Sequence, residues 1–192
     1  MKKRIGTDGP GITDLVALAG CPLSCEYCIN KEELKTSAYN VTPEKLLELV
    51  MAEACYFFAT GGGVTFGGGE PLLQASGIRE FAEIKPEWMK INIETSLNIS
   101  SAAVSSLIPY VDRWIIDIKS LDKNIYKNYT GQDNDMVLSN LELLDKEKCF
   151  IRIPIIPGYK DKETAAAEES KLRGRGFKNI EVFEYIVKER TS

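Results

Sequence analysis

The chain contains no histidine. This absence excludes the usual general base at neutral pH, every Ser-His or Cys-His nucleophile pair, and every zinc site with an imidazole ligand. A metal bound by this chain would therefore need thiolate or carboxylate ligands.

Long apolar runs are also missing. No segment has the roughly 20 apolar residues of a membrane-spanning helix, and Asp8, Pro10 and Asp14 interrupt the region where a signal-peptide core would lie. We therefore expect a cytoplasmic protein without membrane contact. The 24 basic and 28 acidic residues give a net charge of −4 without long runs of one sign, which disfavours sequence-independent binding to nucleic acid. A small substrate or a protein partner is the expected ligand.

The size and composition are those of one globular domain. The chain has 192 residues, of which 44% are hydrophobic and 27% charged, and no linker divides it, so we expect a single domain over residues 1–192. Apolar runs rich in β-branched residues alternate with segments of helical period, which predicts βα units around a parallel sheet. The six expected strands are 14–20, 63–66, 90–95, 113–118, 149–156 and 179–183. Such a chain is too short for a closed eight-unit barrel of about 250 residues, so the predicted class is α/β, a partial (β/α)6 TIM-like barrel of parallel strands with working residues at the strand ends.

Helices are expected between these strands. Thr42 and Pro43 open one helix, whose apolar stripe runs from Leu46 to Ala54 and continues at Cys55. The other expected helices are 72–85, 100–108, 135–147 and 162–173. Because unpaired cysteines are often buried, we interpret Cys55 and Cys149 as small core residues.

The other cysteines form a cluster. Cys21, Cys25 and Cys28 follow the first expected strand, where a tight loop can aim three thiols at one point. An odd total of five cysteines without an export signal indicates reduced thiols or metal ligands. A structural zinc site needs a fourth ligand, which is hard to find here, whereas three thiolates on a [4Fe–4S] cluster leave one iron open for catalysis. The spacing therefore favours iron–sulfur over zinc.

A glycine-rich element follows the second expected strand. Gly68 and Gly69 precede Glu70 and Pro71, and glycines at such a position open the backbone to close approach by a ligand. The alternative is a simple strand-to-helix turn with proline at the helix start. The residues by themselves leave both interpretations open.

Charged residues lie near the ends of three further strands. Two-residue periodicity puts Asp117 and Lys119 on one face of their strand, and the same alternation can turn Glu94 and Arg152 inward. Charges inside a barrel are costly unless they are paired or bound to a ligand. Convergence of these four residues would mark a polar pocket for ribose hydroxyls and a ligand carboxylate. A register shifted by one residue would instead leave them at solvated strand ends.

The Cys-x3-Cys-x2-Cys spacing, with the GGEP element, resembles the radical S-adenosylmethionine (radical SAM) enzymes. The chain is similar to their glycyl-radical-enzyme activase branch, the pyruvate formate-lyase activating enzymes and relatives. The segments that carry this similarity, in family order, are DGPGI at 8–12, Tyr27, GVTFGGGEP at 63–71, DIK at 117–119, YTG at 129–131, RIP at 152–154 and PG at 157–158.

The resemblance implies a radical SAM core and an oxidoreductase with two cofactors, a [4Fe–4S] cluster on Cys21, Cys25 and Cys28 and S-adenosylmethionine (SAM). SAM would bind the open iron, and one electron would cleave its S–C5′ bond to give methionine and a 5′-deoxyadenosyl radical. In the activase branch this radical takes a hydrogen atom from a glycine of a partner glycyl radical enzyme. The resemblance also implies flavodoxin or ferredoxin as the reductant.

The same resemblance implies which residues bind the cofactors. The GGE element would hold the amino group of SAM, with Glu70 bracing the loop. Glu94, Thr95 and Asp117 would overlie a monovalent-cation site known in some activases, although Glu94 stands where the family has aspartate. The expected cofactor-binding residues are Tyr27, Gly68, Gly69, Glu70, Glu94, Asp117, Lys119 and Arg152.

One departure leaves other functions open. Ile186 stands where the activases have a histidine that touches SAM, and the longer tail of the family is absent after it. One alternative is a radical SAM enzyme that modifies a peptide or small molecule. The other is a non-catalytic, zinc-stabilised binding domain.

Overall fold

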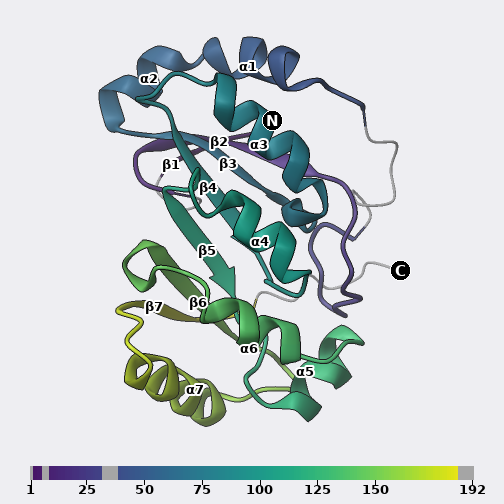
Figure 1. Ribbon diagram of the computed structural model, residues 1–192. Coiled ribbons are helices and arrows are strands. Elements are labelled where there is room, and N and C mark those ends of the chain that lie inside the picture. The colour runs from purple at the N-terminus through teal and green to yellow at the C-terminus, as the bar shows by residue number, and fades with distance from the viewer. Residues whose placement is uncertain (1, 6–8, 32–38, 186–192) are drawn as a thin grey trace, which may run out of the picture.

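The computed structural model describes residues 2–5, 9–31 and 39–185 (Figure 1). The strands are β1 (Lys2–Ile5), β2 (Ile12–Leu18), β3 (Gly63–Gly68), β4 (Lys90–Thr95), β5 (Arg113–Asp117), β6 (Cys149–Ile155) and β7 (Asn179–Glu184). The helices are α1 (Pro43–Met51), α2 (Ala54–Thr60), α3 (Ala75–Ile84), α4 (Ser101–Leu107), α5 (Lys123–Thr130), α6 (Asp135–Leu141) and α7 (Lys162–Gly174). Short 3₁₀ turns are η2 (Pro71–Gln74) and η3 (Lys146–Lys148).

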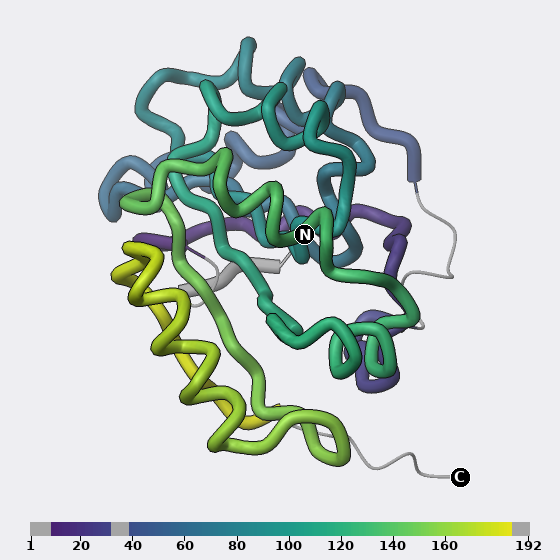
Figure 2. The backbone as a smooth tube through the Cα atoms, turned by 60° about the horizontal axis from the view of Figure 1, so that its bottom comes forward, coloured from purple at the N-terminus to yellow at the C-terminus, as the bar shows by residue number. Residues whose placement is uncertain are grey.

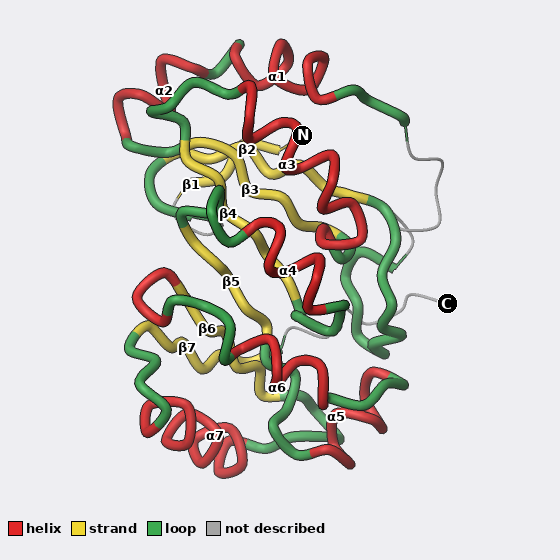
Figure 3. Tube along the Cα trace, in the orientation of Figure 1, coloured by secondary structure: helices red, strands yellow, loops and turns green. Residues whose placement is uncertain are grey.

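One seven-stranded sheet runs in sequence order from β1 to β7 (Figure 3). Each neighbouring pair from β2 to β7 is parallel, which confirms the α/β class and the partial TIM-like architecture. β1 was not expected, and it pairs antiparallel with β2. Its sequence, KKRI, has no alternation of polar and apolar residues from which a strand could be predicted.

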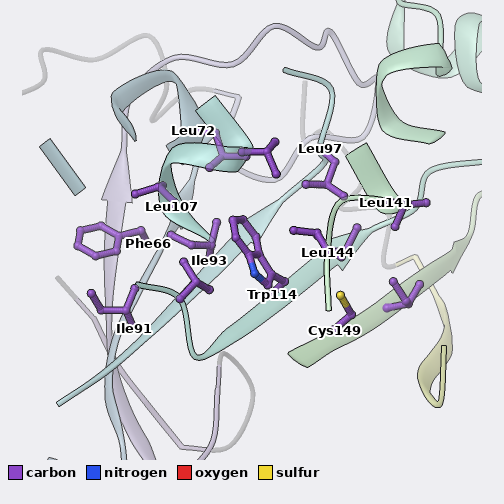
Figure 4. Packing of buried hydrophobic residues seen from close by; sticks show 14 of the residues in the cluster. Phe66, Leu72, Ile91, Ile93, Leu97, Leu107, Trp114, Leu141, Leu144 and Cys149 are labelled. Atoms are coloured by element: carbon purple, nitrogen blue, oxygen red, sulfur yellow. The ribbon is translucent and has the colours of Figure 1, made fainter. Parts of the chain in front are cut away.

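The core lies between the sheet and the helices that cover its outer face. Alternate strand residues supply it, each at most 1% exposed: Val64 and Phe66, Ile91 and Ile93, Trp114 and Ile116, and Ile151 and Ile153. Trp114 lies at its centre among Ile93, Leu97, Leu107 and Leu144 (Figure 4). Because side chains alternate across a strand, the intervening residues share the opposite face, which we call the inner face. There Asn92 donates a hydrogen bond to Thr65 across 3.2 Å.

The first expected helix is divided in two. Thr42 caps α1 as predicted and accepts a hydrogen bond from the amide of Lys45 at 3.3 Å. The chain leaves the helix after α1 and turns at Glu53, so the apolar stripe does not continue to Cys55. Phe57 is the buried residue of α2, and Cys55 is exposed, so the interpretation of Cys55 as a core residue was wrong. Cys149 is 1% exposed, which confirms its place in the core.

Helix α5 was not expected. Asp122 caps it by accepting hydrogen bonds from the amides of Asn124 and Ile125, and Gly131 ends it with a φ of +78°. The expected helix 72–85 begins as η2 and continues as α3, and 135–147 contains α6 and, at its end, η3. Helix α7 follows its prediction closely and lies along β6 and β7 (Figure 2). None of the helices among the described residues has both the length and the apolarity needed to cross a lipid bilayer.

Candidate functional site

The candidate site lies at the carboxyl edge of the parallel strands. Because β2 to β7 run the same way, the loops that follow them meet at one edge of the sheet. The cysteine loop, residues 19–31, follows β2, and the GGE element ends β3. The loop after β5 carries Lys119. The fold thus brings the predicted site residues to the carboxyl edge of the sheet.

The cysteine loop is tied to the elements beside it. Asn30 donates a hydrogen bond to the Gly68 carbonyl at 2.7 Å, and the amide of Ser24 donates to the Thr130 carbonyl at 2.8 Å. The amide of Glu70 donates to the carbonyl of Gly20 at 2.8 Å. These bonds hold the loop between β3 and α5. Figure 2 shows the loop beside α5.

All three cysteines of the loop are free thiols. Cys21 is exposed, and Cys25 and Cys28 are half-buried. Burial raises the pKa of Cys21 and raises that of Cys25 to about 11, although the positive charge of Lys119 opposes the rise at Cys25. Within the described ranges no three thiol or carboxylate groups lie close enough to hold one metal ion.

The GGE element combines an open backbone with a buried carboxylate. Gly68 has a φ of +88°, and a Cβ there would lie 2.8 Å from the Cβ of Ala17, so this position requires glycine. Glu70 is 1% exposed and accepts hydrogen bonds from the Thr95 hydroxyl at 2.6 Å and from the Ser96 amide and hydroxyl at 3.0 and 2.8 Å. Burial raises its pKa against these hydrogen bonds. Glu70 therefore joins the end of β3 to the loop after β4.

Glu94, Asp117, Lys119 and Arg152 converge into one array, which we call the charged network. Arg152 Nε lies 2.7 Å from Asp117 Oδ1, and its Nη2 pairs with Glu94. Lys119 Nζ lies 3.1 Å from Asp117 Oδ2. The expected register is thus confirmed, and residues from three strands and from the loop after β5 meet on the inner face.

The network holds its charges firmly at neutral pH. Burial raises the pKa of Asp117, but the positive charges of Lys119 and Arg152 outweigh it and lower the pKa to about 2. Burial likewise opposes the charge on Lys119 and Arg152, yet their acidic partners raise the pKa of both. The four side chains of the charged network keep between 11% and 23% of their surface exposed, so a ligand can reach them.

Tyr27 belongs to a cluster of four tyrosines. Its ring centroid lies 6.2 Å from that of Tyr129 and 6.4 Å from those of Tyr159 and Tyr185. Tyr159 also donates a hydrogen bond to Glu26 in the cysteine loop. We did not expect Tyr159 and Tyr185 at the site, since only the fold brings them to Tyr27. Lys119 Nζ lies 6.0 Å from the ring of Tyr185, which joins the cluster to the charged network.

Some expectations lie outside the described residues. These are Ile186 with the segment 187–192, and Asp8 at the start of the DGPGI motif.

Comparisons with known proteins agree with the resemblance that the sequence motifs indicate. The family model described as "Radical SAM superfamily" matches residues 15–169. The pyruvate formate-lyase-activating enzyme of Staphylococcus aureus (strain USA300) is 31% identical, with 95% of this chain and 77% of the relative covered. The (2S)-3-sulfopropanediol dehydratase activating enzyme of Klebsiella oxytoca is 29% identical, with 80% and 69% covered.

A solved structure shares the fold. Streptococcus suis SuiB bound to S-adenosylmethionine aligns with a TM-score of 0.70 at 17% identity, covering 93% of this chain and 41% of SuiB. The resemblance inferred from the cysteine spacing and the GGEP element is confirmed by the family match and by two relatives named as activating enzymes. The chain belongs to the radical SAM superfamily of enzymes.

Proposed function

We propose that this protein is a glycyl-radical-enzyme activase, which cleaves SAM reductively and takes a hydrogen atom from a glycine of a partner protein. One observation carries the proposal: the cysteine loop lies beside the charged network, because the ring of Tyr185 lies 6.4 Å from that of Tyr27 in the loop and 6.0 Å from Lys119 Nζ. The names of the two relatives, both activating enzymes, support the choice of partner.

The family implies a [4Fe–4S] cluster and SAM, and the residues present fit both. Cys21, Cys25 and Cys28 are unoxidised thiols on one anchored loop, and thiolates are the ligands of iron–sulfur clusters. Cysteines that bind different irons of a cubane need not meet at one ion. When bound, cluster and SAM supply the one-electron cleavage that yields methionine and a 5′-deoxyadenosyl radical, without an acid or base.

The GGE element and Lys119 would orient the methionine end of SAM. Gly68 and Gly69 are half-buried, and without a Cβ their backbone can approach the amino group closely. Glu70 supports the two glycines and does not bind the ligand itself, because its oxygens already accept hydrogen bonds from Thr95, Ser96 and the amide of Leu72. The charge of Lys119 would attract the carboxylate.

The acidic members of the charged network would hold the ribose. The oxygens of Glu94 and Asp117 can accept hydrogen bonds, and Arg152 and Lys119 together balance the charges of these two carboxylates when water is excluded. The tyrosine cluster that begins at Tyr27 would exclude water on the side of the cysteine loop.

A monovalent cation on Glu94, Thr95 and Asp117 is part of the proposal. There it would share both carboxylates with Arg152. Replacing sodium and potassium by tetramethylammonium in the assay should lower SAM cleavage. Unchanged cleavage would mean that no monovalent cation is needed and that Arg152 alone pairs with Glu94 and Asp117 as their shared cation.

We also propose that residues 1–192 form a single domain, because strands from Lys2 to Glu184 share one sheet. Reduced flavodoxin or ferredoxin is the proposed electron donor, with dithionite as the chemical control.

Anaerobic purification and reconstitution test the cluster. We expect a brown protein with about four irons and four sulfides per chain, which releases 5′-deoxyadenosine from SAM when reduced. Cys21→Ala, Cys25→Ala and Cys28→Ala should each abolish the release. Cys55→Ala is the matched control, since Cys55 is exposed outside the loop, and it should keep both iron and activity. A colourless, zinc-loaded protein would support the zinc-stabilised alternative.

Electron paramagnetic resonance tests the partner. A glycyl radical signal in a candidate glycyl radical enzyme, dependent on SAM and on Cys25, is the expected result. Release of 5′-deoxyadenosine with modification of a peptide or small molecule, and no glycyl radical, would favour the other radical SAM function.

A further inference from the structure

Lys160 and Glu168 form a buried ion pair outside the charged network. Lys160, in the turn after β6, places Nζ 2.8 Å from Oε2 of Glu168 in α7. The two side chains are 0% and 3% exposed. A buried ion pair gains little stability over a well-packed apolar pair, because both ions lose their hydration. Stability alone therefore does not explain the Lys160–Glu168 pair, and its other contacts indicate what it does.

These contacts converge on the segment that follows β5. The hydroxyl of Ser120 and the amide of Leu121 donate hydrogen bonds to Oε1 of Glu168 at 2.5 and 2.7 Å. Lys160 Nζ donates to the carbonyl of Ile118 at 3.4 Å. The pair thus binds residues 118, 120 and 121, on both sides of Lys119.

Lys119 points the opposite way, to the inner face. Its Nζ bonds to Asp117 and lies over the ring of Tyr185. Fixing the backbone on both sides of Lys119 reduces the conformational freedom that ligand binding must remove.

We propose that Glu168, paired with Lys160, is a positioning residue that holds the 118–121 segment so that Lys119 faces the SAM site. The inference rests on the proposed function for the role of Lys119, and on the hydrogen bonds alone for the fixing of the segment. Glu168 touches no ligand in this role.

Hydrogen exchange of the purified protein, without SAM, tests the positioning itself. Glu168→Gln should speed exchange in the peptide that contains residues 118–121 by about tenfold, the loss of about 1.4 kcal/mol of local protection. Glu169→Gln is the matched control, because Glu169 is next to Glu168 on α7 and pairs with Arg173 in a solvent-accessible ion pair. Unchanged exchange in Glu168→Gln would overturn the proposal.

A double-mutant cycle tests the consequence for the ligand. SAM affinity is measured by equilibrium dialysis on reconstituted protein for wild type, Glu168→Gln, Lys119→Met and the double variant. We expect Glu168→Gln to weaken binding about tenfold in the wild-type background and to have little effect in the Lys119→Met background, since contacting residues are not additive. Equal losses in both backgrounds would indicate a general structural effect and overturn the role through Lys119.

A variant without an unpaired buried charge covers the case in which Glu168→Gln does not fold. Lys160→Met with Glu168→Met removes both ions together and should give the same faster exchange and weaker SAM binding. If Lys119→Met leaves SAM affinity unchanged, the proposed link to SAM falls, while release of 5′-deoxyadenosine by wild type still supports the proposed function.

Discussion

At the scale of single residues, Glu70 shows how a buried charge can serve as a joint. Its carboxylate accepts four hydrogen bonds, from the amides of Leu72 and Ser96 and the hydroxyls of Thr95 and Ser96. Hydrogen bonds to a charged group each contribute about 1.5–3 kcal/mol. The residue thereby fixes the end of β3 against the loop after β4.

Glu70→Gln should destabilise the apoprotein by about 2 kcal/mol, because an amide nitrogen cannot accept two of these hydrogen bonds. Urea unfolding followed by tryptophan fluorescence measures the change. Glu80→Gln on the exposed side of α3 is the control and should have little effect. A loss no larger than that of the control would contradict the bracing role.

Asp117 gives a prediction about pH. Its pKa of about 2 in the folded protein, against 3.8 for the free side chain, means that its ion pairs stabilise the fold above pH 3.8 and are lost as the pH falls toward 2. Asp117→Asn should therefore be less stable than wild type at pH 6 by about 1–2 kcal/mol, and this difference should shrink as the pH falls below 4. Unfolding of both apoproteins at a series of pH values checks it. A difference that stays constant would show that the charge of Asp117 does not contribute.

Single residues of the site could be predicted from the sequence where their placement depends only on neighbours along the chain. Two-residue alternation predicted that Asp117, Arg152 and Glu94 share a face, because it depends only on strand geometry. It could not predict that Tyr159 and Tyr185 lie at Tyr27, because contacts across more than 100 residues depend on how the elements pack.

At the scale of elements, the end of β3 shows how a backbone conformation limits sequence. Gly68 combines a positive φ with a close approach to Ala17, and its carbonyl accepts the hydrogen bond from Asn30 that ties down the cysteine loop. A side chain at this position would strain the strand end and move that loop.

Gly68→Ala should destabilise the protein by about 1–3 kcal/mol, the cost of an unfavourable backbone conformation. It should also lower the iron retained after reconstitution. Gly77→Ala in α3 is the control of opposite sign, since a Cβ there meets nothing within 4 Å and alanine favours the helix by about 1 kcal/mol. Thermal unfolding and iron analysis check both variants. A Gly68→Ala protein as stable as wild type would contradict the strain.

The elements themselves were largely predictable, with exceptions that have physical causes. The six parallel strands carry clear apolar runs, and α7 has both a cap at Asp161 and a glycine end. The break between α1 and α2 was missed, because apolar residues follow one another in the sequence through a turn that no glycine or proline marks. Helix α5 was missed because it is polar, although Asp122 and Gly131 supply a start and a stop.

At the scale of the whole molecule, the two faces of the sheet have different roles. The outer face forms the apolar core around Trp114, and the inner face carries the charged network toward the open edge. A ligand that binds the network is therefore expected to stabilise the folded protein without changing the core.

SAM should raise the melting temperature of the reconstituted protein. At a concentration 100 times its dissociation constant, a ligand adds about 2.7 kcal/mol. For a chain of this size, that corresponds to about 5–10 °C. Differential scanning calorimetry under anaerobic conditions measures the shift. The Cys25→Ala protein should show little of it, and an equal shift in that variant would mean that SAM binds without the cluster.

The order of the strands bears on how the protein is made. From β1 to β7, every strand lies beside the one translated just before it, so none has to wait for a distant partner. Each newly synthesised unit can dock on a sheet edge that already exists outside the ribosome. We expect nascent chains released after α6 to resist protease over β2 to β5, with β6 and β7 added to this sheet afterwards.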